Sequence, residues 1–137
     1  MQVQPYLAFE GRCEEAIEFY KSALGAELAM LVRFKEHPQP QPPEMVHSGT
    51  ENKVMHARLR LGDSIVMMSD GRCTGSTDFR GICLSLTAAD KSEAEKYFNA
   101  LAEGGKVSMP FGPTFFSPGF GMVDDRFGVP WMVLTER

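Results

Sequence analysis

Two stretches of the chain, Gly62 to Asp70 (GDSIVMMSD) and Gly128 to Glu136 (GVPWMVLTE), follow one plan. Each begins with a glycine, continues through an apolar run of strand length and ends in an acidic residue. An apolar run that follows a turn residue is typical of a buried β-strand. The two stretches lie 66 residues apart (62 to 128), and they predict a chain built from one unit used twice.

The repeat extends to a helix in each half. Glu15-Ala16 and Phe19-Tyr20 correspond to Glu93-Ala94 and Tyr97-Phe98, which follow 78 residues later. Apolar residues at helical spacing predict a helix over 13–24 that ends before a glycine. The second helix runs to about residue 101, and either Asp90 or Ser92 can cap its start.

Strands surround each helix. In the first half we expect them at Val3–Phe9, Glu27–Phe34, Lys53–Leu61 and Ser64–Asp70, and in the second at Gly81–Leu86, Val107–Phe111, Phe115–Asp124 and Pro130–Thr135. The proline-dense segment 37–43 predicts a loop. Each half is therefore a βαβββ module, and the fold class is α+β.

The duplication predicts one domain made of two modules. The modules span about 1–70 and 81–137, and a linker rich in Gly, Ser and Thr joins them at about 71–80. A unit of about 60 residues buries its own core poorly, so the two copies are expected to pack together.

Composition favours an ordinary soluble protein. The 137 residues carry a net charge of −4, with Lys and Arg scattered, which argues against nucleic acid as a partner. Three cysteines without a CxxC spacing favour a reducing compartment. No signal-like start and no run of 18 apolar residues is present, so we expect a cytoplasmic protein without membrane contact.

Several motifs lie along the chain, among them Tyr6–Gly11 and Met55–Ala57, and the strongest are Met109-Pro110 and Phe120–Met132. Together they resemble the vicinal-oxygen-chelate superfamily, which includes glyoxalase I, extradiol dioxygenases and bleomycin-resistance proteins. The chain is similar to the PhnB-like branch, some of whose members carry a "3-demethylubiquinone methyltransferase-like" label. The resemblance implies two modules whose curved mixed sheets enclose a cavity, commonly in a homodimer.

Metal-dependent members of that superfamily place His, Gln or Glu ligands on the first and last strand of each module. The matching positions here are Pro5, Val66, Cys83 and Met132. Proline, valine and methionine do not serve a hard divalent ion, and a single cysteine is a poor substitute. We therefore expect no such metal centre and no cofactor.

A polar set on one strand is the first candidate for ligand binding. Alternate residues of Lys53–Leu61 are apolar and are expected to pack beneath the helices, which sends the polar set to the opposite face: His56, Arg58 and Arg60. The neighbouring strand is expected to bring Val66, Met68 and Asp70 to that same face. His56, oriented by Asp70, is then a candidate for proton transfer. The alternative is that His56 is structural and both arginines are solvated.

An apolar set is the second candidate. Phe111, Phe116, Met132 and Cys83 are expected to line the pocket beside Met68. The alternative is that the aromatic residues form core or a dimer interface. The acidic turn Asp124-Asp125-Arg126 is predicted to bond its own backbone.

Two functions from different classes follow. The first is a metal-independent protein that binds a small organic molecule. The second is an enzyme of isomerase, lyase or transferase type that uses His56 and Asp70. Methyl transfer is not expected, because Gly104-Gly105 follows a helix instead of leading from a strand into one.

Overall fold

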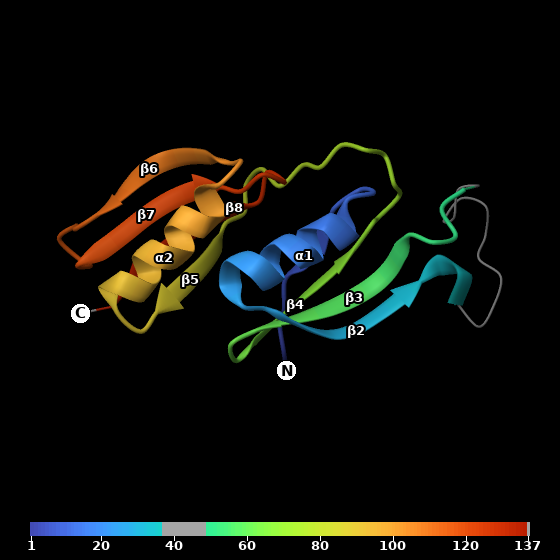
Figure 1. Ribbon diagram of the computed structural model, residues 1–137, viewed down its shortest axis with the longest axis horizontal. Coiled ribbons are helices and arrows are strands. Elements are labelled where there is room, and N and C mark those ends of the chain that lie inside the picture. Colours follow the sequence, from blue (N-terminus) through green and yellow to red (C-terminus); the bar gives the residue numbers. More distant parts are fainter. Residues whose placement is uncertain (37–48, 137) are drawn as a thin grey trace. The chain divides into compact units, whose positions relative to one another are not determined.

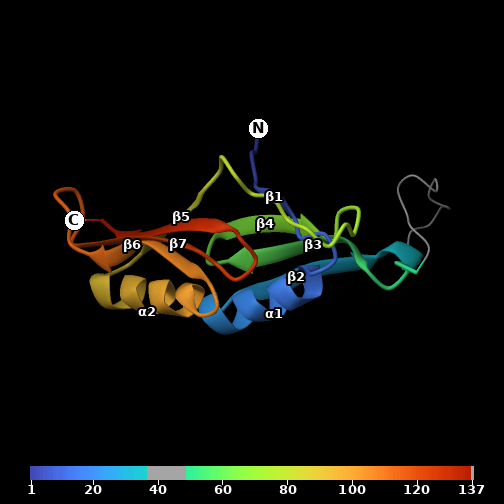
Figure 2. The same cartoon turned by 90° about the horizontal axis from the view of Figure 1, so that it is seen from above.

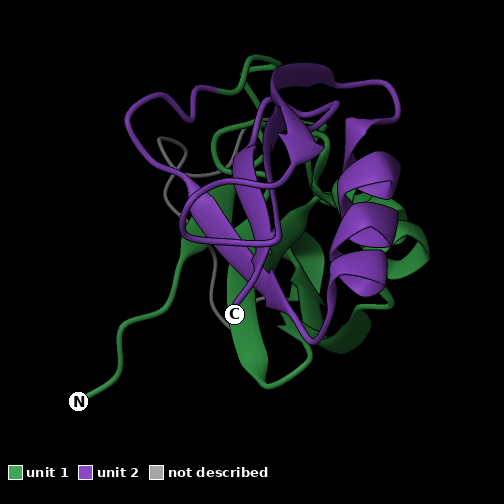
Figure 3. Cartoon of the chain, turned by 90° about the vertical axis from the view of Figure 1, so that its left-hand side faces the viewer, with its two compact units in different colours: residues 1–77 green, residues 78–137 purple. Residues whose placement is uncertain are grey.

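A computed structural model describes residues 1–36 and 49–136. The expected proline-dense loop at 37–43 lies outside these residues. The chain forms two compact units, Met1–Thr77 and Asp78–Arg137, which Figure 3 colours separately. Each unit contains one copy of the repeat.

Unit 1 contains a four-stranded mixed sheet and one α-helix (Figure 1). Its elements are β1 (Tyr6–Ala8), α1 (Cys13–Leu24), β2 (Glu27–Arg33), the 3-10 turn η1 (Phe34–Glu36), β3 (Val54–Leu61) and β4 (Ser64–Ser69). The strand order is β1-β4-β3-β2, in which only β1 and β4 run parallel. Figure 2 shows α1 lying along one face of this sheet.

Unit 2 repeats this arrangement. Its elements are β5 (Leu84–Ala88), α2 (Lys91–Ala102), β6 (Lys106–Gly112), β7 (Gly119–Asp124) and β8 (Pro130–Thr135), in the sheet order β5-β8-β7-β6. The α+β class and the two-module βαβββ plan are confirmed. The expected strand over 115–124 begins only at Gly119, because a turn precedes it, in which the Ser117 N–H bonds Thr114 Oγ1 at 3.0 Å.

The helices begin where local chemistry places them. Asp90 is the N-cap of α2, and its side chain accepts a bond of 2.8 Å from the Glu93 N–H. Helix α1 ends at Gly25, whose φ of 68° lies in the left-handed region. Both helices have 12 residues, and no helix in the described part of the chain is long and apolar enough to cross a membrane.

Each helix covers a buried sheet face. The largest fully buried side chains of unit 1 include Tyr20, Leu59 and Met68, and those of unit 2 include Leu101 and Val133. Burying one such side chain contributes about 1.5–3 kcal/mol. The sheet face turned away from the helix, here called the open face, is the remaining place for a site within each unit.

Candidate functional site

The open face of unit 1 carries the polar strand residues. Ala57 and Leu59 are fully buried on the helix side of β3. Because side chains alternate along a strand, His56, Arg58 and Arg60 lie on the opposite face. This is the placement that the sequence alternation predicts.

The sequence placed Val66, Met68 and Asp70 on the same face as His56 and Arg58, and this placement is wrong by one residue along β4. The tight turn at Gly62-Asp63 pairs Leu61 with Ser64, so Arg58 pairs with Met67 and Arg60 with Ile65. Residues that pair across antiparallel strands share a face. Met67 and Ile65 therefore occupy the open face, whereas Val66 and the fully buried Met68 lie beneath α1.

Asp70 is a structural residue of unit 1. Its carboxylate accepts two backbone bonds of 2.7 Å, from the Cys13 N–H at the start of α1 and from the Val54 N–H at the start of β3. Its side chain is buried, and a negative charge at a helix N-terminus is favourable. Both carboxylate oxygens are thus used to join three elements, and the expectation that Asp70 orients His56 is not supported.

Tyr6 takes the place that the sequence assigned to Asp70. Its hydroxyl lies 3.2 Å from His56 Nδ1, and the two rings stack with centroids 5.6 Å apart. Tyr6 on β1 is opposite Met67 on β4, so it reaches the open face from the far strand. Sequence reasoning missed this residue, because only the parallel pairing of β1 with β4 brings it near His56.

Arg58 occupies the middle of this face. It is half-buried and pairs with Met30 on β2 and Met67 on β4. Within residues 1–36 and 49–136 its guanidinium makes no hydrogen bond or ion pair. By contrast, Arg60 is exposed and bonds Glu27 at 2.8 Å. Met30, Arg58, Met67 and Tyr6 form one row across four strands, here called the Arg58 row.

The open face of unit 2 carries sulphur and aromatic side chains. Met109, Met122, Met132 and Ser85 are paired in register across β6, β7, β8 and β5. This row, here called the methionine row, occupies the position of the Arg58 row. Along the same face, the Phe116 ring packs edge-to-face against the Phe120 ring, with the ring centroids 5.0 Å apart.

Phe111 lies on the helix side and not on the open face. Its ring packs against Phe98 of α2, with centroids 5.6 Å apart, and lies over Gly119. A bulge in β6 between Met109 and Gly112 turns it inward. The expectation that Phe111 lines a ligand site is therefore wrong.

Cys83 immediately precedes β5 and is half-buried. Burial is the main reason that the pKa of its thiol lies above the ordinary value, so the group is a neutral thiol at pH 7. Cys13 in unit 1 is fully buried, and its thiol pKa is raised much further by desolvation and by Asp70. Neither thiol is a ready nucleophile.

The positions matching the superfamily's metal ligands do not fit a hard divalent ion. Pro5 has no donor side chain, Val66 is buried beneath α1, and the open-face residue of β4 is Met67. In the described parts of the chain, no group of three or more His, Cys, Asp or Glu residues is placed to hold a metal ion. The donors that these positions do offer are thioethers and one thiol.

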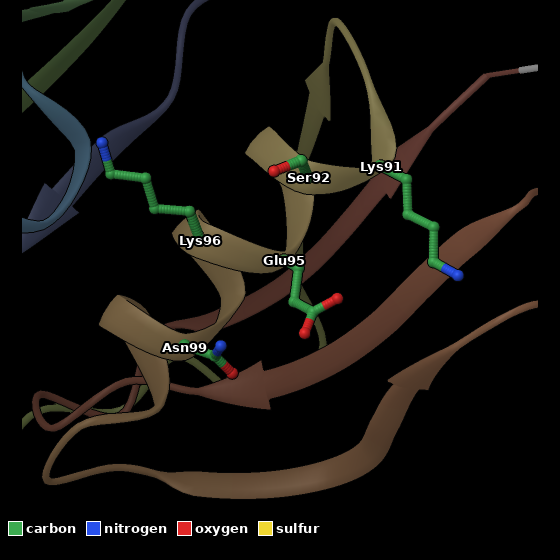
Figure 4. Close-up of a pocket in the computed structure, with 5 residues that line it drawn as sticks. All are labelled: Lys91, Ser92, Glu95, Lys96 and Asn99. Carbon is green, nitrogen blue, oxygen red and sulfur yellow. The ribbon is translucent and has the colours of Figure 1, made fainter.

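One surface depression lies along α2, lined by Lys91, Ser92, Glu95, Lys96 and Asn99. All five residues are exposed and come from the same helix. Figure 4 shows the side chains of Lys91 and Lys96 pointing in opposite directions. Because these groups do not converge, the depression does not form a binding site.

Two-module chains of this topology occur among known proteins. A glyoxalase-related enzyme from Fulvimarina pelagi shares the fold, with 16% identity and a TM-score of 0.62 over 99% of this chain and 88% of that chain. The family described as 3-demethylubiquinone-9 3-methyltransferase matches residues 1–134. The chain belongs to this PhnB-like family.

Three relatives illustrate the match. Protein YjdN of Escherichia coli K12 is 38% identical, over 97% of this chain and 94% of YjdN. The crystal structure of protein PA1353 from Pseudomonas aeruginosa is 44% identical with a TM-score of 0.85, and covers 99% of this chain and 98% of its own. A putative 3-demethylubiquinone-9 3-methyltransferase, PhnB protein, from Bacillus cereus is 28% identical with a TM-score of 0.78, over 98% and 99% of the two chains.

Proposed function

We propose that the protein binds a small organic molecule with an anionic group on the open face of unit 1. The single observation that carries this proposal is Arg58, a half-buried residue whose guanidinium has no hydrogen-bond or charge partner in the described residues. An anionic ligand is the natural complement of a guanidinium without a counter-ion.

The neighbours of Arg58 suit the rest of such a ligand. Met30 and Met67 flank the guanidinium with flexible, polarisable thioethers that adapt to an apolar body. The stacked Tyr6–His56 pair lies on the same face and adds a hydroxyl and an imidazole for polar contacts. A carboxylate or phosphate ester on a small aromatic body matches this combination.

Calorimetry with benzoate, salicylate and phenyl phosphate tests the proposal. Arg58→Met is expected to weaken binding about tenfold or more, because hydrogen bonds to charged groups contribute about 1.5–3 kcal/mol. Arg60→Met is the matched control, since it removes an exposed arginine from the same strand and face. Equal affinities in the two variants, or no binding of any of the three anions, would reject the site.

The Tyr6–His56 pair favours a second candidate, an enzyme that uses His56 for proton transfer. A hydroxyl 3.2 Å from Nδ1 fixes the ring and leaves Nε2 for a substrate. If this enzyme exists, Tyr6→Phe should shift the pH profile of turnover, whereas His56→Ala should abolish turnover and spare folding. Weakened binding alone in His56→Ala supports the binding protein.

We also propose a cytoplasmic homodimer. Large apolar side chains remain exposed outside the Arg58 row and the methionine row, including Ile82 at 52% and Phe115 at 93%, and a second copy is the partner that the family suggests. Light scattering should then return twice the 15.2 kDa chain mass. The three cysteines are free, as in proteins of a reducing compartment.

Methyl transfer forms no part of the proposal. The family description contains the word methyltransferase, which refers to a reaction that uses a methyl donor. A Gly-rich turn from a strand into a helix is the usual binding site for such a cofactor. Here Gly104 follows α2 and leads into β6. We expect no calorimetric signal with S-adenosylmethionine at micromolar concentration.

A further inference from the structure

The methionine row of unit 2 brings sulphur together on one sheet face. Met109 pairs with Met122, and Met122 pairs with Met132, so the three side chains stand side by side on adjacent strands. Neighbouring strands lie about 4.8 Å apart, and methionine has three rotatable bonds beyond Cα. The outer two side chains can therefore lean over the central one and bring their sulphur atoms together.

A fourth sulphur lies beside this row. Cys83 immediately precedes β5, two residues before Ser85, the β5 member of the row. Its thiol lies 3.7 Å from the Leu84 carbonyl oxygen, and both the Met132 backbone and the Asp124 carboxylate influence its pKa. Asp124, two residues beyond Met122 on β7, adds a carboxylate to the same face.

These groups have the chemistry of a soft cation site. Thioethers and thiolates select Cu(I), whereas carboxylates and imidazoles suit harder ions. Cys83 is a neutral thiol at pH 7, so it would release its proton to solvent when the metal binds. Asp124 contributes a negative charge, which its β6 partner Lys106 offsets in part. In unit 1 the central position of the corresponding row is Arg58, whose positive charge opposes the same ion.

We infer that the open face of unit 2 binds one monovalent soft metal ion, with Cu(I) as the matching ion, through Met122, Met132 and Cys83, with Met109 as a fourth donor. The hard-ion site of the superfamily is thus replaced, on this sheet, by a set of sulphur donors. The inference does not depend on the anion site proposed for unit 1.

Anaerobic titration of the full chain with Cu(I), in competition with bicinchoninate, tests the inference. The wild type should retain one Cu(I) per chain. Met122→Leu with Met132→Leu should weaken binding by at least about tenfold, since even an outer-shell change costs about 10- to 100-fold in metal affinity. Methionine-to-leucine exchanges conserve volume, so the fold should persist.

The matched control removes the same number of methionines from unit 1. Met30→Leu with Met67→Leu should leave Cu(I) affinity unchanged. X-ray absorption should show a shell of sulphur alone, and Cys83→Ser should remove one sulphur from it. The inference is overturned if no Cu(I) is retained, if both double variants lose it equally, or if Cys83→Ser alone abolishes binding while the methionine variants do not.

Discussion

Arg58 in unit 1 and Met122 in unit 2 occupy the same position of two sheets with the same strand order. Each sits on the third strand of its module, opposite a methionine on both neighbouring strands. One side chain therefore changes a face suited to an anion into a face suited to a soft cation or an apolar body. The comparison teaches that the repeat preserves strand order, whereas the open-face side chains decide the chemistry.

Each unit also contains a buried aspartate that accepts hydrogen bonds from the backbone, but the two aspartates lie at different places in the repeat. In unit 1, Asp70 at the end of β4 binds the start of α1 and of β3. In unit 2, Asp125 lies in the loop between β7 and β8, where it accepts bonds from the backbone of Phe127 and Val129 and from Trp131 Nε1. Unit 1 needs no such residue in its hairpin, because a two-residue turn joins β3 to β4.

Asp125→Ala is expected to have the largest effect on stability among the substitutions that test this comparison. It leaves three donors without an acceptor in a buried loop, and should lower the free energy of unfolding by about 3–5 kcal/mol. Urea denaturation measures the loss. Asp124→Ala changes the half-exposed neighbour and should cost far less; equal losses would show that Asp125 is not the anchor of the loop.

Asp70→Ala should cost about 2–4 kcal/mol, because two backbone donors lose their acceptor. Both oxygens of the Asp70 carboxylate are used by these backbone donors, so the contact between the Tyr6 and His56 rings should persist in this variant. Asp63→Ala, at the exposed turn, is the control for charge. Loss of the ring–ring NMR contact in Asp70→Ala alone, with the fold intact, would restore the pairing of Asp70 with His56 that the structure argues against.

Gly121 and Ala57 occupy matching positions beneath the helices, and exchanging their side chains gives the smallest expected effects. A Cβ on Gly121 would lie 2.7 Å from the Phe98 ring, so Gly121→Ala should cost about 1–3 kcal/mol through overpacking. Ala57→Gly should cost about 1 kcal/mol, from one lost methyl group and a more flexible strand. Thermal unfolding of both variants checks the order, and a neutral Gly121→Ala would mean that the aromatic packing can shift.

Much of the fold was predictable because local rules are strong. The boundaries of α1 follow from apolar spacing and a terminal glycine, and the cap of α2 is Asp90, one of the two residues expected. The backbone bonding of the acidic turn is confirmed at Asp125. The sheet face that each strand residue occupies was harder to predict. The predicted face is correct for His56 and Arg58 and wrong for Met68, because a shift of one residue in strand register moves a side chain to the opposite face.

The site residues divide in the same way. Phe111 was misplaced because a bulge in β6 changes the alternation that sequence reasoning assumes. Tyr6 was missed because a parallel pairing joins residues from opposite ends of the module. Neither the bulge nor the pairing leaves a signal in the local composition.

The sequence alone determined that this protein is a duplicated α+β chain, since hydrophobic period, caps and turn residues act over a few neighbouring positions. Its motifs gave the resemblance to the PhnB-like family, which the family match over residues 1–134 bears out. Only the tertiary structure decided that Asp70 anchors a helix, that Tyr6 contacts His56 and that Arg58 lacks a partner in the described residues. These outcomes depend on strand register and on contacts between residues up to 61 positions apart in the chain (Tyr6 and Met67). Such contacts form when strands pair, and one residue of register changes every one of them.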